Sequence, residues 1–254
     1  MYDAIIVGAR CAGSPTAMLL GSKGYRILLV DKSTFPSDMA MSTHLVHQPG
    51  VARLRRWGLL EQVVSSNCPP ITKYHFDFGT VIPGLILDGS PPPAGDITEA
   101  YAPRRRILDS ILVNAAAKAG AEVRENFSVH DLVWDQGRVS GVRGRDKRGA
   151  AVTENATIVI GADGMNSRVA RSVQAPEYNT KPPIAGPYFS YWSGLKLDGF
   201  EFYLAEGRCS FGWMTNDNLA LVGVGWTASE FPRMRTNVEG NYLGVIDTCS
   251  PSLA

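Results

Sequence analysis

The chain has 254 residues, 25 of them basic and 24 acidic, so its formal net charge is +1. This balance gives no electrostatic reason for binding nucleic acid or an anionic membrane surface. No apolar run approaches the ~20 residues of a membrane span, and the first predicted strand leaves no room for a signal peptide. We therefore expect a cytoplasmic protein that neither binds nucleic acid nor associates stably with a membrane.

The first stretch, residues 3–31, follows a strand–turn–helix–strand pattern. The apolar run Ala4–Val7 predicts a strand buried on both faces. Gly8 permits a sharp turn, and Gly13 lets the following helix pack closely against the sheet. The N-terminus of that helix suits a pyrophosphate. Asp31 follows the second strand, where a carboxylate can accept both hydroxyl groups of an adenosine ribose.

One position departs from the dinucleotide fingerprint G-x-G-x-x-G, because Arg10 occupies the place of the middle glycine. That glycine normally allows close approach of the backbone to the phosphates. An arginine either blocks this approach or turns its guanidinium group onto the phosphates. The spacing alone also fits an ordinary βαβ unit with a glycine-rich turn, so both interpretations stay open here.

Residues 39–48 contain His44 and His47, whose spacing would place two metal ligands on one helix face. No third ligand lies at a useful spacing, so polar residues that face a cofactor or solvent are the favoured interpretation of this segment. The four cysteines form no C-x-x-C pair, and we expect reduced thiols and no metal site. Residues 51–64 are predicted to form one helix with its arginines toward solvent.

The middle of the chain alternates between sheet and helix signals. Residues 67–103 predict strands and loops, and residues 104–119 predict a helix with an apolar stripe. The first turn of this helix holds Arg104, Arg105 and Arg106, which oppose the helix dipole. Either an anion lies nearby, or the three arginines are a solvated charge run.

The remaining sequence predicts mostly strands. Residues 129–153 favour an antiparallel meander, and residues 157–160 form an apolar strand that leads into a second strand–turn–helix. After residue 183 the chain is predicted to be strand-like to its end. The aromatic residues of this region suit an antiparallel sheet, and most must be core. We name three of them as candidates for a pocket that takes a flat apolar substrate, with core packing as the alternative for each: Tyr188, Tyr191 and Trp213.

Three features coincide in order: the Gly8–Gly13 turn with Asp31, the Arg105-x-x-Leu108-x-x-x-Leu112 helix start, and Gly161-Ala162-Asp163-Gly164-x-x-Ser167. Together they resemble the FAD-dependent oxidoreductases of the aromatic hydroxylase type, which include para-hydroxybenzoate hydroxylase and the geranylgeranyl reductases. The string from Gly8 to Ser14 is similar to a bacterial subgroup in which an arginine replaces the middle glycine.

The resemblance implies an α/β fold, with a Rossmann-like FAD/NAD(P)-binding domain and an inserted antiparallel β-sheet substrate domain. The expected FAD-binding domain comprises residues 1–70 and 104–178, with a β-meander near 127–154. The expected substrate domain comprises residues 71–103 and 179–254. A third family motif, Gly-Asp before a proline-containing helix start, has no match, so we expect a C-terminally truncated chain.

The resemblance also assigns roles to residues. The pyrophosphate would be held by the first turn, the ribose by Asp31, and the adenine would meet a backbone group at Val129. Asp163 and Gly164 would brace the phosphate region. The full set of expected cofactor-binding residues is Gly8, Arg10, Ala12, Gly13, Ser14, Asp31, Lys32, Ser42, His44, Arg105, Val129, Asp163 and Gly164.

The expected function is an FAD-dependent oxidoreductase, most simply a monooxygenase that uses NAD(P)H as electron donor and hydroxylates an aromatic or olefinic small molecule. The alternatives are an FAD-binding fragment without activity and a flavin reductase that acts on a prenyl double bond, as in the geranylgeranyl reductases. An NAD-dependent dehydrogenase is a further alternative, and the second motif at Asp163 and Gly164 argues against it.

Overall fold

The structure is a computed structural model that describes residues 1–250 and contains two compact units. Unit 1 comprises residues 1–40 and 105–179, and unit 2 comprises residues 41–104 together with the chain from residue 180 onward. This division corrects the expected one for residues 41–70, which belong to unit 2. The reason is that Pro70–Ile71 (β3) and Val46 both pair with Ala100–Tyr101 (β6).

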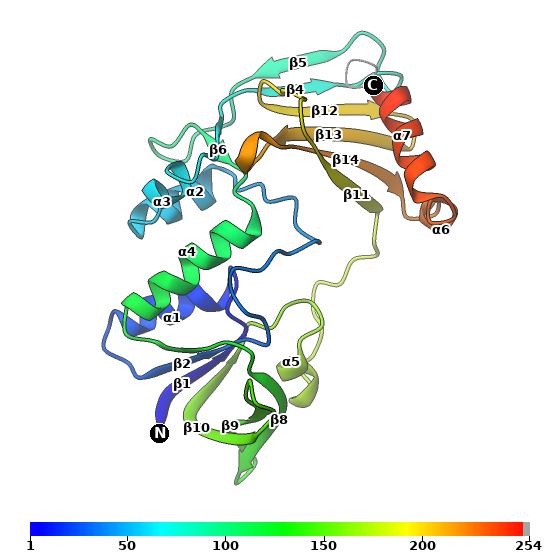
Figure 1. The fold of residues 1–254 in the computed structure, drawn as a ribbon. Coiled ribbons are helices and arrows are strands. Elements are labelled where there is room, and N and C mark those ends of the chain that lie inside the picture. The colour runs from blue at the N-terminus through cyan, green and yellow to red at the C-terminus, as the bar shows by residue number, and fades with distance from the viewer. Residues whose placement is uncertain (251–254) are drawn as a thin grey trace. The chain divides into compact units, whose positions relative to one another are not determined.

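Unit 1 is built on a six-stranded sheet in the order β7-β2-β1-β10-β9-β8 (Figure 1). Its strands are β1 (Tyr2–Val7), β2 (Ile27–Val30), β7 (Glu122–Arg124), β8 (Ser128–Asp135), β9 (Arg138–Arg145) and β10 (Ala151–Gly161). Its helices are α1 (Gly13–Gly21), α4 (Arg105–Lys118) and α5 (Arg168–Ser172), and α1 packs against α4. The predicted α/β, Rossmann-like architecture of this part is confirmed.

Strand β10 joins two kinds of sheet in one piece. Its first half pairs antiparallel with β9, from Ala151 to Asn155, and its second half pairs parallel with β1, from Ala156 to Gly161. The sequence predicts a break here, with the last strand of the meander over residues 150–153 and a separate apolar strand over residues 157–160. The polar residues between them, Glu154 and Asn155, stay in the ladder because a strand with one face toward solvent accepts alternating polar side chains.

The core of unit 1 explains the apolar runs of the parallel strands β1 and β2. Ile5, Leu28 and Val30 have no exposed side-chain surface, and they pack with Phe127 and Leu132 from the meander side. Burial of each such side chain stabilises the fold by about 1.5–3 kcal/mol. The core therefore fixes β1 and β2, whose ends carry the first turn and Asp31.

Unit 2 contains a second six-stranded sheet, in the order β11-β14-β13-β12-β4-β5. Its strands are β4 (Tyr74–Asp77), β5 (Ile86–Gly89), β11 (Ala185–Trp192), β12 (Phe200–Ala205), β13 (Arg208–Met214) and β14 (Ala220–Thr227). Neighbouring strands pair antiparallel except β4 and β12, which are parallel. The predicted antiparallel sheet is therefore mixed at this one pair.

Helices cover parts of unit 2. Residues 51–64, expected as one helix, form α2 (Gln48–Arg56) and α3 (Leu60–Val64), separated at Gly58, whose φ is +70°. The C-terminal segment, expected as strand, instead forms α6 (Phe231–Met234) and α7 (Val238–Cys249), and a short 3₁₀ turn spans Asn216–Asn218. Within residues 1–250, no helix has the length and apolar character needed to cross a membrane.

The correction at α7 has a clear physical reason. Asn237 caps the helix, because its side chain accepts a hydrogen bond from the N–H of Gly240 at 3.1 Å. Tyr242, Val245, Ile246 and Cys249 recur at helical spacing and pack on the sheet core with Val222, Val224 and Trp226. The spacing of these apolar residues and the preceding Asn are both legible in the sequence.

Candidate functional site

The turn between β1 and α1 depends on two positions that cannot carry a side chain. Gly8 has φ +104°, and a Cβ atom there would lie 2.3 Å from the backbone oxygen of Ala162. A Cβ atom on Gly13 would lie 1.7 Å from the backbone oxygen of Gly8. These approaches are far below van der Waals contact, so the turn keeps its shape only with glycine at both positions. The turn thus places the N-terminus of α1 at the end of β1, where the N–H of Ser14 donates to the carbonyl of Arg10 at 3.0 Å and the N–H of Thr16 donates to the carbonyl of Ala12 at 3.4 Å.

The second turn lies directly against the first. The N–H of Ala162 donates to the carbonyl of Val7 at 2.8 Å, which continues the β1–β10 ladder up to Gly8. Asp163 accepts hydrogen bonds from the Ser167 hydroxyl at 2.5 Å and from the N–H of Arg168 at 2.6 Å. Asp163 thus orients the start of α5, while the adjacent Gly164 is exposed with φ +84°.

Asp31 connects the end of β2 to the first turn. Its Oδ2 accepts from the N–H of Ala9 at 2.7 Å, and its Oδ1 accepts from the N–H of Ser33 at 2.8 Å. Each carboxylate oxygen has more than one acceptor direction, so both remain able to accept a ligand hydroxyl. The carboxylate therefore sits where the sequence predicts, at the mouth of the turn.

Arg10 does not point freely into solvent. Its Nη1 lies 2.5 Å from Oδ2 of Asp109 on α4, and its Nη2 donates to the Ser37 hydroxyl at 2.9 Å. The guanidinium group also lies over the ring of Phe35, 5.4 Å from its centroid. The side chain in the place of the middle glycine thus ties the first turn to α4 and to the loop after β2.

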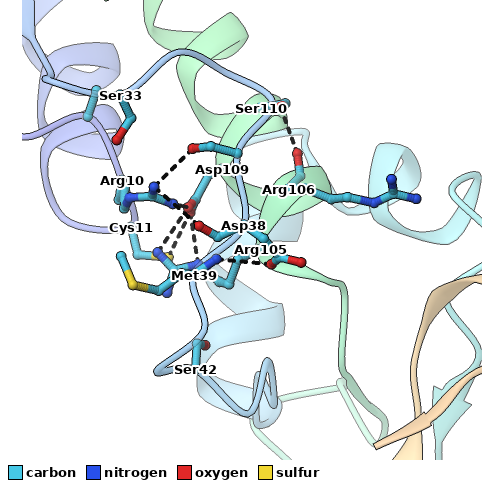
Figure 2. Close-up of polar contacts among 12 residues, drawn as sticks. Arg10, Cys11, Ser33, Asp38, Met39, Ser42, Arg105, Arg106, Asp109 and Ser110 are labelled. Carbon is cyan, nitrogen blue, oxygen red and sulfur yellow. Dashed lines mark hydrogen bonds and ion pairs between the residues drawn. The ribbon is translucent and has the colours of Figure 1, made fainter. Parts of the chain in front are cut away.

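Arg105 reaches the same carboxylate from one helical turn away. Its Nε donates to Oδ1 of Asp109 at 3.0 Å and its Nη2 donates to Oδ2 at 3.1 Å. Figure 2 shows Arg10 and Arg105 converging on Asp109, with Cys11 beside them. The side chain of Asp109 is fully buried, whereas the two arginines retain 18% and 13% exposure. Two cations and one carboxylate leave a net charge of +1 beside the turn.

Cys11 adds a weak donor to this group. Its Sγ lies 3.5 Å from Oδ1 of Asp109. Desolvation raises the pKa of the Cys11 thiol to about 11, and the Asp109 carboxylate acts in the same direction while Arg105 opposes it. The thiol therefore stays protonated at neutral pH and donates to the carboxylate.

Other expected cofactor residues of unit 1 lie on the same elements. Ser14 is buried in α1 and donates to the carbonyl of Ala9 at 2.8 Å, which braces the turn. Ala12 and Lys32 are exposed, and Val129 is half-buried in β8 against the core. Their contacts with a cofactor stay predictions.

Ser42 and His44 belong to unit 2. The Ser42 hydroxyl accepts from the N–H of His44 at 3.2 Å, and His44 is buried with φ +66° and hydrogen-bonds the Tyr191 hydroxyl through Nε2. His47 hydrogen-bonds the Tyr74 hydroxyl at 2.8 Å. Among residues 1–250, no group of three His, Cys, Asp or Glu side chains is placed to hold a metal ion.

The three aromatic pocket candidates differ in environment. Trp213 is 3% exposed, stacks on Phe200 and Phe211, and therefore takes the core-packing alternative. Tyr188 is half-buried and stacks on Phe231. The ring of Tyr191 is half-buried, and the guanidinium group of Arg104 lies 4.6 Å from its centroid. Tyr191 is thus the candidate with the most polar surroundings.

Asp109 is the residue that the sequence reasoning missed. The sequence predicts that the three arginines at the start of α4 either face an anion or are solvated, and the structure gives Arg105 an anion from its own helix. The signal was present as an i, i+4 pair, Arg105 and Asp109, a spacing that places both side chains on one helix face.

The family comparison now agrees with the geometry. A model described as "FAD binding domain" matches residues 1–205. The chain belongs to this family. The FAD-dependent type recognised from the sequence motifs is confirmed, and FAD is the cofactor that the family description names.

Relatives and solved structures are similar over most of the chain. Digeranylgeranylglycerophospholipid reductase of Methanothrix thermoacetophila is 28% identical over 233 residues, which cover 88% of this chain and 56% of the relative. The myxobacterial chondrochloren halogenase CndH shares the fold with a TM-score of 0.82 at 19% identity, over 98% of this chain and 58% of that one. A geranylgeranyl bacteriochlorophyll reductase-like protein of Thermoplasma acidophilum has a TM-score of 0.71 at 21% identity, over 90% and 57%. The chain thus spans a little over half the length of these proteins.

Proposed function

We propose that unit 1 binds the ADP half of FAD and that the chain is the FAD-binding part of an FAD-dependent oxidoreductase. The observation that carries the proposal is the contact between the two glycine-containing turns at Gly8 and Ala162, with Asp31 hydrogen-bonded to the first of them. A helix N-terminus, the Asp31 carboxylate as ribose acceptor, and the Arg10–Arg105–Asp109 cluster with its net charge of +1 lie at one end of the parallel strands. That end is where α/β sheets bind nucleotides.

The residues present fit this cofactor. Backbone N–H groups of the turn before α1 and the Arg105 guanidinium would bind the diphosphate, and Asp31 would accept the ribose hydroxyls. The remaining contacts with the cofactor would come from Lys32, Ala12, Val129 and Gly164. A 2′-phosphate in place of the ribose hydroxyl would meet the Asp31 carboxylate and be repelled. This supports FAD over NADP at this turn.

Bound FAD would supply the redox chemistry, with electrons from NAD(P)H. For the substrate we propose an apolar small molecule with a carbon–carbon double bond, which the enzyme reduces. The curated relatives support this choice, since those at 25–30% identity are named as reductases of a digeranylgeranyl lipid. Hydroxylation of an aromatic or olefinic molecule is the second candidate, because the three sequence motifs are shared by the aromatic hydroxylases and the geranylgeranyl reductases.

A visible absorption spectrum tests whether the chain binds FAD. The purified chain, incubated with FAD and desalted, is expected to show the visible absorption of bound flavin. Addition of NADH or NADPH without oxygen is expected to bleach these bands. Oxygen uptake in the presence of a trial aromatic substrate would favour hydroxylation, whereas anaerobic reoxidation by a geranylgeranyl lipid would favour reduction. A colourless protein that cannot be loaded with FAD would contradict the proposal.

A further inference from the structure

We infer that Asp109 is a positioning residue that holds Arg10 and Arg105 in the orientation in which they attract the diphosphate of FAD. The inference rests on the proposed FAD site. It adds to that site a residue that contacts the two arginines and not the ligand itself. The Arg10 side chain reaches Asp109 across 99 positions of sequence, while Arg105 reaches it from within α4.

The contacts of the carboxylate are already complete. Asp109 receives Arg10 Nη1 at 2.5 Å, Arg105 Nε at 3.0 Å, Arg105 Nη2 at 3.1 Å and Cys11 Sγ at 3.5 Å. A carboxylate offers about four acceptor sites, so these contacts use its capacity. Because its side chain is also fully buried, Asp109 acts on a ligand through the arginines and not by contact.

Charge explains why the pair needs this residue. Two guanidinium groups that approach one another with no anion between them repel, and burial makes the repulsion larger. Asp109 cancels one of the two charges and leaves the other to a bound anion. Arg10 has a second set of guanidinium contacts, from Nη2 to the Ser37 hydroxyl and from Cζ to the face of the Phe35 ring, while Asp109 sets the direction of its Nη1.

The alternative is a purely structural role, in which Asp109 only joins the first turn to α4. The two roles differ in what they predict for ligands with and without phosphates. A structural role affects adenosine and ADP alike, since both need the turn and Asp31. A positioning role affects ADP and leaves adenosine nearly unchanged, because only ADP carries the diphosphate.

The experiment compares Asp109→Asn with the wild-type chain by NMR-detected titration of ADP and of adenosine. The expected result is an increase of about ten-fold in the Kd for ADP, the size of one lost charge-assisted hydrogen bond, with the Kd for adenosine changed by less than about two-fold. The direction is informative by itself. Removal of a negative charge would tighten ADP binding if only the net charge mattered.

Two further variants keep the test decisive if Asp109→Asn unfolds. Asp109→Glu keeps the charge but displaces the oxygens by one methylene, and it is expected to retain the fold and weaken ADP binding. The loss caused by Arg10→Met is expected to be smaller in the Asp109→Asn background than in the wild type, as for residues that act through one another. Asp135→Asn, an exposed charge change on β8 of the same unit, is the matched control.

Each outcome decides one question. Unchanged or tighter ADP binding in both Asp109 variants overturns the inference, as does an equal loss for ADP and adenosine. A wild-type chain that binds ADP but fails to take up FAD contradicts the proposed function while leaving the role of Asp109 supported by its own variants. A wild-type chain that binds neither nucleotide contradicts both.

Discussion

The backbone N–H of Ala9 donates a hydrogen bond of 2.7 Å to the carboxylate of Asp31, which joins the first turn to the end of β2. Asp31→Ala removes this bond and the proposed ribose acceptor together. We expect the Kd for FAD to rise by about ten-fold or more, since each hydrogen bond to a charged group contributes at least ~1.5 kcal/mol. Flavin fluorescence titration measures this. An Asp31→Ala chain with wild-type affinity would refute the ribose assignment, and Asp135→Asn serves as the control.

Gly13 packs against the backbone oxygen of Gly8 so closely that a Cβ atom would lie 1.7 Å from it. We expect Gly13→Ala to lower the free energy of unfolding by about 1–3 kcal/mol, because overpacking against backbone forces the turn to shift. Urea denaturation measures the loss. Gly244→Ala is the matched control, since a Cβ atom on this glycine of α7 meets nothing within 4 Å. The control is expected to gain up to about 1 kcal/mol from helix propensity.

Glu122 accepts hydrogen bonds from the Tyr2 hydroxyl at 2.6 Å and from Arg124 Nε at 2.7 Å. The hydrogen bond from Tyr2 is the largest influence on the pKa of Glu122 and lowers it from the usual 4.5. Desolvation raises this pKa by less than the Tyr2 bond lowers it, and Arg124 lowers it further. A carboxyl group with a lowered pKa in the folded state stabilises the fold above pH 4.5, and this contribution is lost as the pH falls through the folded pKa. The effect is modest, because the side chain is 49% exposed.

Urea midpoints at pH 7 and near pH 3 check this expectation. Wild-type stability should fall more between the two pH values than that of Glu122→Gln. Tyr2→Phe should also reduce the pH dependence, because it removes the hydrogen bond that shifts the pKa most. Identical pH dependence in all three chains would be the contrary result.

Tyr242 links α7 to the sheet of unit 2. Its hydroxyl donates to the carbonyl of Val222 at 2.9 Å and accepts from Trp192 Nε1 at 2.9 Å. We expect Tyr242→Phe to lower the free energy of unfolding by about 1–3 kcal/mol, the usual result of leaving a buried polar group without a partner. Tyr178→Phe, at an 85% exposed side chain, is the control and should change stability by less than about 0.5 kcal/mol.

The elements that the sequence predicts correctly are those with strong local patterns of apolar residues and glycines. The run before Gly8 could be interpreted correctly because a parallel strand buried on both faces leaves an unbroken apolar sequence. The strand before Asp163 was also located from its apolar residues, although Ile158 within it is 52% exposed. The strand prediction for the α7 segment is wrong because this segment follows a series of aromatic-rich strands, whereas its own apolar residues are spaced for a helix. The placement of residues 41–70 depends on β3 pairing with β6, a contact that no local pattern records.

The residues of the candidate site likewise fall into those that local sequence patterns predict and those that depend on tertiary packing. Glycines and Asp31 occupy positions set by backbone geometry, so spacing alone located them. The Arg10–Asp109 contact depends on how α1 and α4 pack, and neither residue signals it locally. From the sequence alone, Arg10 is a departure from the glycine fingerprint, and its role becomes clear only with its partner Asp109.

The continuity of β10 has a consequence for which sequence changes unit 1 tolerates. No loop separates its pairing with β9 from its pairing with β1, so an inserted or deleted residue in this strand requires a β-bulge or a change of register. A one-residue deletion would exchange its two faces and displace Ala162 from Gly8 by about 3.3 Å. A length change at the tip of the β8–β9 hairpin leaves that contact untouched. We therefore expect changes in the length of the meander to be tolerated better at the tip of the β8–β9 hairpin than within β10.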